Sequence, residues 1–127
     1  MKRAPRWLSA AAVLAIHERL IAEHGGAAGL RDERLLESAL ASPLNHLAYA
    51  DADLFGLAAA YASALTRNHP FHDGNKRVAA AATIMFVYLN DRDLACTEDE
   101  LVELTLGVAR GETTKAAAAV FLATRIR

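Results

Sequence analysis

Nine consecutive residues, at positions 69–77, concentrate the side chains of this chain that could do chemistry. They read His-Pro-Phe-His-Asp-Gly-Asn-Lys-Arg and include two histidines, one carboxylate, one amide and two cations. Transfer of a phosphoryl or nucleotidyl group to a hydroxyl needs a base for the hydroxyl proton and positive groups around the phosphate, usually with a metal ion. The stretch contains a candidate for each of these tasks.

Three of these residues are candidates for catalysis, metal binding and anchoring. His69 is the candidate base, because a histidine can accept a proton at neutral pH. Asp73 is the single carboxylate of the stretch, so it is the natural ligand for Mg²⁺ or the group that orients the site. Phe71 is apolar, and we expect it to insert into the core and anchor the loop.

The end of the stretch has the features of a phosphate site. Gly74 lets the backbone approach a ligand, and a helix that begins at Asn75 directs its free N–H groups toward the same space. Lys76 and Arg77 then lie in the first turn, where cations oppose the helix dipole unless an anion is bound. The pattern favours a phosphate site over the alternative, a polar loop with two solvated cations.

Apolar residues at helical spacing, together with capping residues, predict an all-α fold around this stretch. The fourth expected helix has almost no polar face, so we expect it to be buried at the centre of the domain. The six expected helices run from Ser9 to Gly25, from Asp32 to about Ala41, from Asp53 to near Asn68, from Asn75 to Asn90, from Thr97 to around Gly107–Gly111, and from Thr113 or Thr114 through Thr124.

Two segments are expected to be irregular. Residues 42–52 lose the helical pattern after Pro43 and are predicted to be a loop, or a small hairpin at most. His69 precedes Pro70, and a proline disfavours the α region for the residue before it, so His69 is predicted to have an extended backbone.

Composition indicates one soluble globular domain over residues 1–127. The chain is 54% hydrophobic and 23% charged, and its formal net charge of −1 gives no sign of a nucleic-acid or membrane partner. The single cysteine, Cys96, excludes a disulfide framework and favours a reducing cytoplasm. Basic residues before the first apolar run imitate an export signal, but the helical pattern continues beyond it and favours a folded helix.

The stretch at 69–77 resembles the H-x-F-x-[D/E]-G-N-[G/K]-R signature of the Fic/Doc family at every defined position. The expected surroundings are also similar to that family, since the motif lies between two helices of a small helical domain. Length and the Gly-Gly turn after the first helix resemble the Doc-type members, which are toxins of toxin–antitoxin modules. The resemblance implies the Fic/Doc fold.

Two positions distinguish the subfamilies. AMP-transferring members usually have a second glycine where this chain has Lys76, and a further arginine where it has Ala80. In that group the arginine holds the terminal phosphates of ATP. The resemblance therefore implies a Doc-like kinase, which transfers the γ-phosphate of ATP to a serine or threonine hydroxyl of a protein, with elongation factor Tu as the expected target. AMP or UMP transfer is the nearest alternative.

The resemblance also implies roles for the motif. His69 becomes the general base, Asp73 the Mg²⁺ ligand or orienting group, and Phe71 the anchor, while Gly74, Asn75, Lys76 and Arg77 hold the phosphate of ATP. The chain has no Ser or Thr followed four residues later by Glu, so it lacks the internal inhibitory motif of many Fic proteins. A cognate Phd-like antitoxin is the expected control. The segment 42–52 corresponds roughly to the family's target-docking flap.

Other functions remain open from the residues. His72-Asp73 is a His-Asp pair, as in HD-type metal phosphohydrolases, with His46 or His69 and Asp91 or Asp93 as conceivable further ligands. A binding module without catalytic activity is the other alternative. His17 and His24 lie seven residues apart, and we interpret them as packing and surface residues rather than a metal pair.

Overall fold

The residues that the structure describes form six helices, as the sequence predicts. The computed structural model describes residues 4–50 and 53–126. Within these residues extended pairing is limited to two isolated bridges, Leu30 with Phe71 and Leu94 with Ile126. The helices are α1 (Ala10–His24), α2 (Glu33–Ala50), α3 (Leu54–Asn68), α4 (Asn75–Leu89), α5 (Glu98–Ala109) and α6 (Lys115–Arg125).

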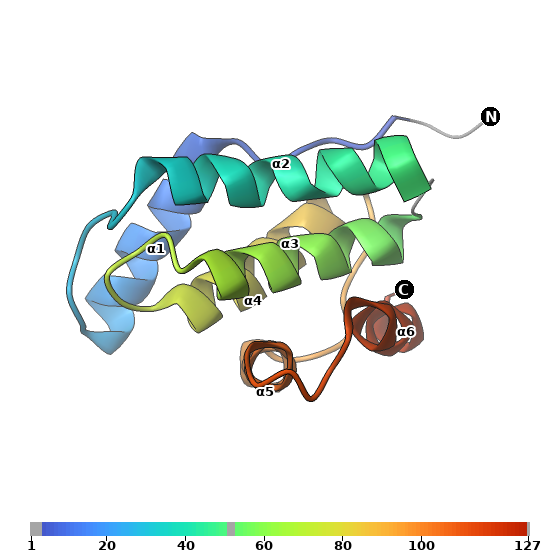
Figure 1. Ribbon diagram of the computed structural model, residues 1–127. Coiled ribbons are helices and arrows are strands. Elements are labelled where there is room, and N and C mark those ends of the chain that lie inside the picture. Colours follow the sequence, from blue (N-terminus) through green and yellow to red (C-terminus); the bar gives the residue numbers. More distant parts are fainter. Residues whose placement is uncertain (1–3, 51–52, 127) are drawn as a thin grey trace.

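The centre of the domain is formed by α3 and α4 together. Helix α3 contacts α2, α4, α5 and α6, and Figure 1 shows it side by side with α2. Seven consecutive residues of α3, 57–63, are buried, five of them alanines or serine that let the neighbouring helices approach closely. Helix α4 is buried over most of its length, but Met85 and Tyr88 are 39% and 69% exposed. The predicted buried helix is therefore confirmed in α4, and α3 shares the centre of the domain with it.

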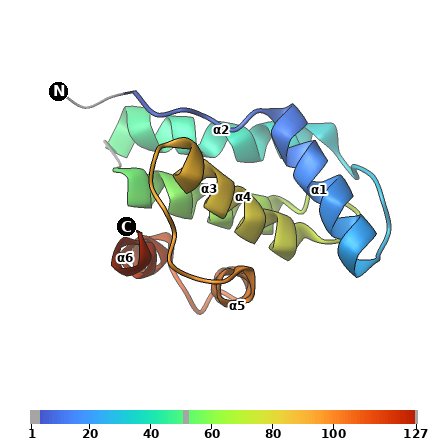
Figure 2. The ribbon, with the colours of Figure 1, turned by 180° about the vertical axis from the view of Figure 1, so that it is seen from behind.

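Helix α1 closes the other side of α4, as the view from behind shows (Figure 2). Ser9 caps it by accepting a hydrogen bond from the amide of Ala12, and Gly25 ends it with a positive φ of 78°, as expected. The segment before α1 is tied to the core where the hydroxyl of Tyr61 accepts a hydrogen bond from the Leu8 amide at 3.1 Å. Burial raises the pKa of Tyr61, and this hydrogen bond partly opposes the rise.

The predicted loop at 42–52 was wrong. Helix α2 continues through Pro43 to Ala50, while residues 51–52 and the side chain of Tyr49 lie outside the described part. A proline inside a helix removes one backbone hydrogen bond. The helix continues because the ring of Pro43 is buried and Leu40 and Leu47 pack against the core, so tertiary contacts along α3 offset the local cost. The segment expected to correspond to the target-docking flap is therefore helical as far as Ala50.

The last two helices begin as predicted. Thr97 and Glu100 form a complete capping box at the start of α5, and Thr114 caps α6. Glu100 also accepts a 3.0 Å ion-pair hydrogen bond from Arg125 near the end of α6. The C-terminal segment is further held where the amide of Ala95 donates to the carbonyl of Arg125. No helix in the described ranges is both long and apolar enough to cross a membrane.

Candidate active site

The loop between α3 and α4 lies against the segment between α1 and α2, at one end of the molecule (Figure 1). The amides of Arg31 and Asp32 both donate to the carbonyl of Pro70, at 2.7 and 3.1 Å. The amide of His72 donates to the carbonyl of Gly29 at 3.3 Å. Backbone hydrogen bonds therefore fix the loop on its outer side.

His69 does not have the predicted extended backbone. Its φ of 51° and ψ of 54° lie in the left-handed region, where it ends α3. Proline disfavours the α region for the preceding residue and favours the extended one, so the left-handed conformation of His69 depends on other contacts. Here the contacts of the His69 carbonyl decide it, because that oxygen accepts a 2.9 Å hydrogen bond from Nε of Arg31.

Asn75 ties both ends of the loop together with its side chain. Its Oδ1 accepts from the amide of Phe71 at 3.0 Å, and its Nδ2 donates to the Phe71 carbonyl at 2.9 Å. The second hydrogen on Nδ2 is directed at Nδ1 of His69, 3.1 Å away. Because an amide nitrogen only donates, Nδ1 of His69 must accept, and the neutral ring carries its proton on Nε2.

Phe71 and His17 support the loop from inside. Phe71 is 1% exposed, so its predicted insertion into the core is confirmed. His17 of α1 stacks on the Phe71 ring with centroids 3.9 Å apart, and its Nε2 makes a 2.9 Å hydrogen bond to the carbonyl of Asp73. This contact is not among the features predicted from the sequence. The available signal was a polar ring between Ile16 and Leu20 on the apolar face of α1.

Asp73 is held by the turn that follows α1. Its Oδ2 accepts from the amide of Ala27 at 3.0 Å. Gly26 packs so closely that a Cβ there would lie 3.2 Å from the same oxygen. The carboxylate is thereby fixed beside the start of α4 while the residue stays exposed.

The start of α4 leaves backbone donors available for an anion. Gly74 is its N-cap, with a left-handed φ of 78°, and makes no side-chain capping hydrogen bond. Lys76 and Arg77 follow in the first turn, both half-buried. Arg77 pairs with Asp99 of α5 across 3.7 Å, an exposed pair that an anionic ligand can displace.

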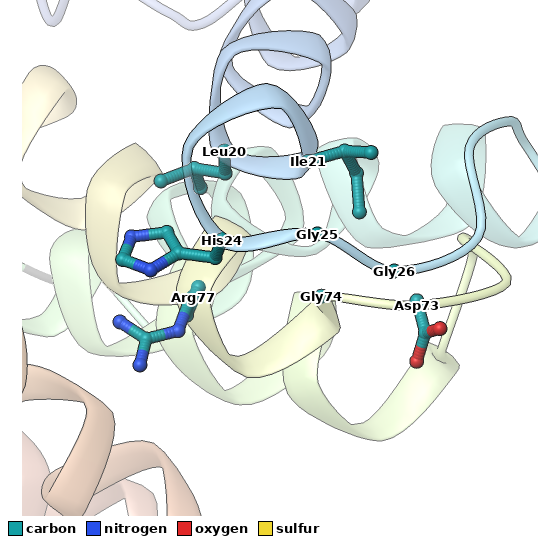
Figure 3. Close-up of a pocket in the computed structure, with 8 residues that line it drawn as sticks. All are labelled: Leu20, Ile21, His24, Gly25, Gly26, Asp73, Gly74 and Arg77. Atoms are coloured by element: carbon teal, nitrogen blue, oxygen red, sulfur yellow. The ribbon is translucent and has the colours of Figure 1, made fainter.

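Two hollows flank the Asp73–Gly74 backbone. The first, about 240 Å³, is lined by Val102 and seven motif residues: His69, His72, Asp73, Gly74, Asn75, Lys76 and Arg77. The second, about 300 Å³, lies against the end of α1. Figure 3 shows His24 and Arg77 on one side of it and Asp73 on the other, with the Gly25–Gly26 backbone between. The sequence-predicted residues thus surround one site with two compartments.

The residues of the HD-type alternative are not brought together. No group of three or more His, Cys, Asp or Glu side chains that could hold a metal occurs among residues 4–50 and 53–126. His46 lies on α2, where its ring contacts the Ser42 carbonyl and Nζ of Lys115. Asp93 lines a separate hollow with Met85 and Tyr88.

Comparison with known proteins identifies the family. The model of the Fic/DOC family matches residues 7–87, which contain the site, helices α1 to α3 and most of α4. The chain therefore belongs to the Fic/Doc family. It is 33% identical over 108 residues to a protein named Protein kinase doc of Escherichia phage P1, covering 84% of this chain and 85% of that protein. It is 42% identical over 77 residues to Toxin Doc of Mycolicibacterium smegmatis, covering 59% of each. Within the family it is Doc-like.

Proposed function

We propose that this protein is the toxin of a toxin–antitoxin module and a protein kinase that transfers the γ-phosphate of ATP to a serine or threonine hydroxyl. The observation that carries the proposal is the start of α4, where uncapped backbone N–H groups and two cations lie beside His69 and Asp73 in one hollow. An anion at this position offsets the unfavourable placement of Lys76 and Arg77 in a first helical turn.

His69 receives the proton of the target hydroxyl. In the transfer, the hydroxyl oxygen forms a bond to the γ-phosphorus, the bond from that phosphorus to the bridging oxygen breaks, and ADP leaves with the electron pair. The lone pair of the neutral His69 ring is on Nδ1, where Asn75 donates to it. Proton acceptance at this nitrogen therefore requires the Asn75 amide to give way to the hydroxyl. The contact between the two residues is a resting arrangement.

Asp73 fits the requirement for Mg²⁺. One of its oxygens, Oδ2, is occupied by the Ala27 amide, and the exposed carboxylate retains its other oxygen for a ligand. Magnesium is commonly bound by one or two carboxylates together with substrate phosphates and water, so a single aspartate suffices. The ion supplies charge neutralisation of the phosphates when bound.

The residue at position 80, an alanine, favours phosphoryl transfer over AMP transfer as the proposed reaction. Ala80 is fully buried in α4, so the place of the additional arginine of AMP-transferring members faces the core here. Lys76 instead supplies a cation inside the hollow of the motif. A side chain that reaches the terminal phosphates from position 80 is therefore missing, while a cation for the transferred phosphate is present.

We propose elongation factor Tu as the target, as the resemblance to the Doc-type members implies, and the cytoplasm as the place of action. The internal inhibitory motif is missing from the sequence, so a cognate Phd-like antitoxin is proposed as the control. The similarity to a protein named Toxin Doc supports an antitoxin partner.

The test is transfer of label from ATP to protein. Purified protein is incubated with elongation factor Tu, or with a bacterial lysate, and ATP labelled at the α- or the γ-phosphate. Transfer from the γ position alone, lost in His69→Ala, is the expected result. Transfer from the α position would show an AMP transferase in place of a kinase. If no label is transferred from either position, to elongation factor Tu or to any protein of the lysate, the enzymatic function is contradicted.

A further inference from the structure

The structure assigns Arg31 a role in the reaction, as the positioning residue that holds His69 in its left-handed conformation. Arg31 lies outside the 69–77 motif, in the segment between α1 and α2. The inference rests on the proposed role of His69 as the base. It concerns how that ring is placed, since the hydrogen bonds of Arg31 within the described residues go to backbone carbonyls.

The guanidinium of Arg31 binds the end of α3. Its Nε donates to the carbonyl of His69 at 2.9 Å, and its Nη2 donates to the carbonyl of Asn68 at 3.2 Å. The last carbonyls of a helix have no partner within the helix, so a cation with two donors in a fixed plane satisfies them and complements the negative end of the dipole. One side chain thus determines where two successive carbonyls point.

Of these two carbonyls, the one of His69 belongs to a residue with an intrinsically unfavourable backbone conformation, which needs a stabilising contact. His69 has φ 51° and ψ 54°, a conformation that crowds Cβ against the carbonyl oxygen in any residue with a side chain. This conformation directs the carbonyl to Arg31 and leaves the ring within reach of Nδ2 of Asn75. Loss of the Arg31 hydrogen bond therefore allows the backbone to relax toward the extended form that Pro70 also permits.

Arg31 is itself fixed at both ends. Its amide donates to the Pro70 carbonyl at 2.7 Å, while its side chain binds the His69 carbonyl. Arg31 therefore holds two successive carbonyls of the loop. The next residue, Asp32, donates its amide to the same carbonyl and uses Oδ1 to cap α2 through the amides of Arg34 and Leu35. The position of His69 is consequently coupled to the start of α2.

The alternative is a purely structural role, in which Arg31 stabilises the end of α3 and does not position His69. That role changes the stability of the fold without moving the His69 ring or separating kcat from KM. Arg31→Ala and Arg31→Lys are the test variants, because lysine keeps the charge but lacks the planar pair of donors. Arg34→Ala is the matched control, since it removes a neighbouring exposed arginine from the same surface.

Two readouts decide the question. Nitrogen NMR of the His69 ring, assigned with His69→Ala, reports the hydrogen bond at Nδ1, and kinetics of γ-phosphate transfer report kcat and KM for ATP. For Arg31→Ala we expect an altered Nδ1 signal and a kcat lowered about tenfold to a hundredfold, as displaced catalytic groups show, with KM for ATP unchanged. Arg31→Lys is expected to recover part of kcat, and Arg34→Ala to match the wild type.

The outcomes are separable from those of the proposed function. If the wild type transfers no phosphate, the kinase proposal fails, and the NMR comparison still decides the role of Arg31. A wild-type His69 signal in folded Arg31→Ala, or a loss of activity that follows fractional unfolding alone, overturns the positioning role. If Arg31→Ala does not fold, Arg31→Lys decides, because a wild-type ring signal and kcat in that variant contradict the need for the paired donors.

Discussion

Nδ2 of Asn75 donates a hydrogen bond to Nδ1 of His69 across 3.1 Å, and the same amide group makes two further hydrogen bonds to the backbone of Phe71. Both donors and the acceptor of the buried Asn75 side chain are therefore used in hydrogen bonds within the loop. For binding a phosphate, Asn75 retains its backbone N–H in the first turn of α4. The side chain that is hydrogen-bonded to the candidate base thus also stabilises the conformation of the loop.

Replacement of Asn75 by alanine is expected to destabilise the fold. It leaves the buried amide and carbonyl of Phe71 without partners, which lowers the free energy of unfolding by about 2–4 kcal/mol. Chemical denaturation measures the loss. Asn68→Ala is the control, because Asn68 makes one part-buried hydrogen bond to Leu35, and we expect a loss of about 1 kcal/mol there. Equal losses in the two variants contradict the account.

We expect His17 to help position Asp73 in addition to packing against Phe71. In His17→Phe the stacked ring over Phe71 is retained and the hydrogen bond to the Asp73 carbonyl is lost, so stability falls by about 1 kcal/mol. Phosphate transfer falls further than stability because Asp73 is less firmly placed. His17→Ala also removes the ring contact and costs about 2 kcal/mol more. Unfolding curves and transfer rates are compared, and full activity in His17→Phe speaks against the supporting role.

Gly26 and Gly25 offer a matched pair for testing the placement of Asp73. Both have positive φ, but a Cβ at Gly26 lies 3.2 Å from Oδ2 of Asp73, whereas nothing lies within 4 Å of a Cβ at Gly25. Each alanine variant is expected to lose about 1 kcal/mol of stability from backbone strain. Transfer activity is expected to fall in Gly26→Ala alone, measured at a temperature where both variants are folded. Equal transfer activities in Gly25→Ala and Gly26→Ala would contradict the proposed role of the turn in placing Asp73.

Glu100 is expected to make stability depend on acidity. Its pKa is lowered by the hydrogen bond from the Thr97 amide and further by Arg125. A group with a lowered folded-state pKa stabilises above its unfolded pKa, and that contribution disappears as pH falls through the folded pKa. In Glu100→Gln the capping box is kept and the ion pair with Arg125 is lost. Thermal unfolding should show the variant less stable at neutral pH and equal to the wild type in acid. A constant difference at all pH values contradicts this.

The parts of the fold that could be predicted from sequence are those set by short-range chemistry. Capping residues such as Ser9 and Thr97 give the helix starts, and the 69–77 motif marks the site. The insertion of Phe71 into the core follows from its apolar side chain in a polar loop. Each of these features depends on residues within a few positions of one another.

The remaining features depend on contacts between distant parts of the chain. Helix α2 passes through Pro43 because its face packs along α3, against the local preference of a proline. His69 takes the left-handed conformation because Arg31, 38 residues earlier, binds its carbonyl. His17 reaches Asp73 over 56 residues. Local pattern does not determine such pairings, since they arise when the helices meet.

The most direct test of the central claim is the mass of the target after reaction. Elongation factor Tu incubated with the wild-type protein, ATP and Mg²⁺ is digested and analysed by mass spectrometry, alongside a reaction with His69→Ala. The account predicts one added phosphate group on a serine or threonine of the target, formed by the wild type and not by the variant. A nucleotide in place of the phosphate, or phosphorylation that persists in His69→Ala, contradicts it.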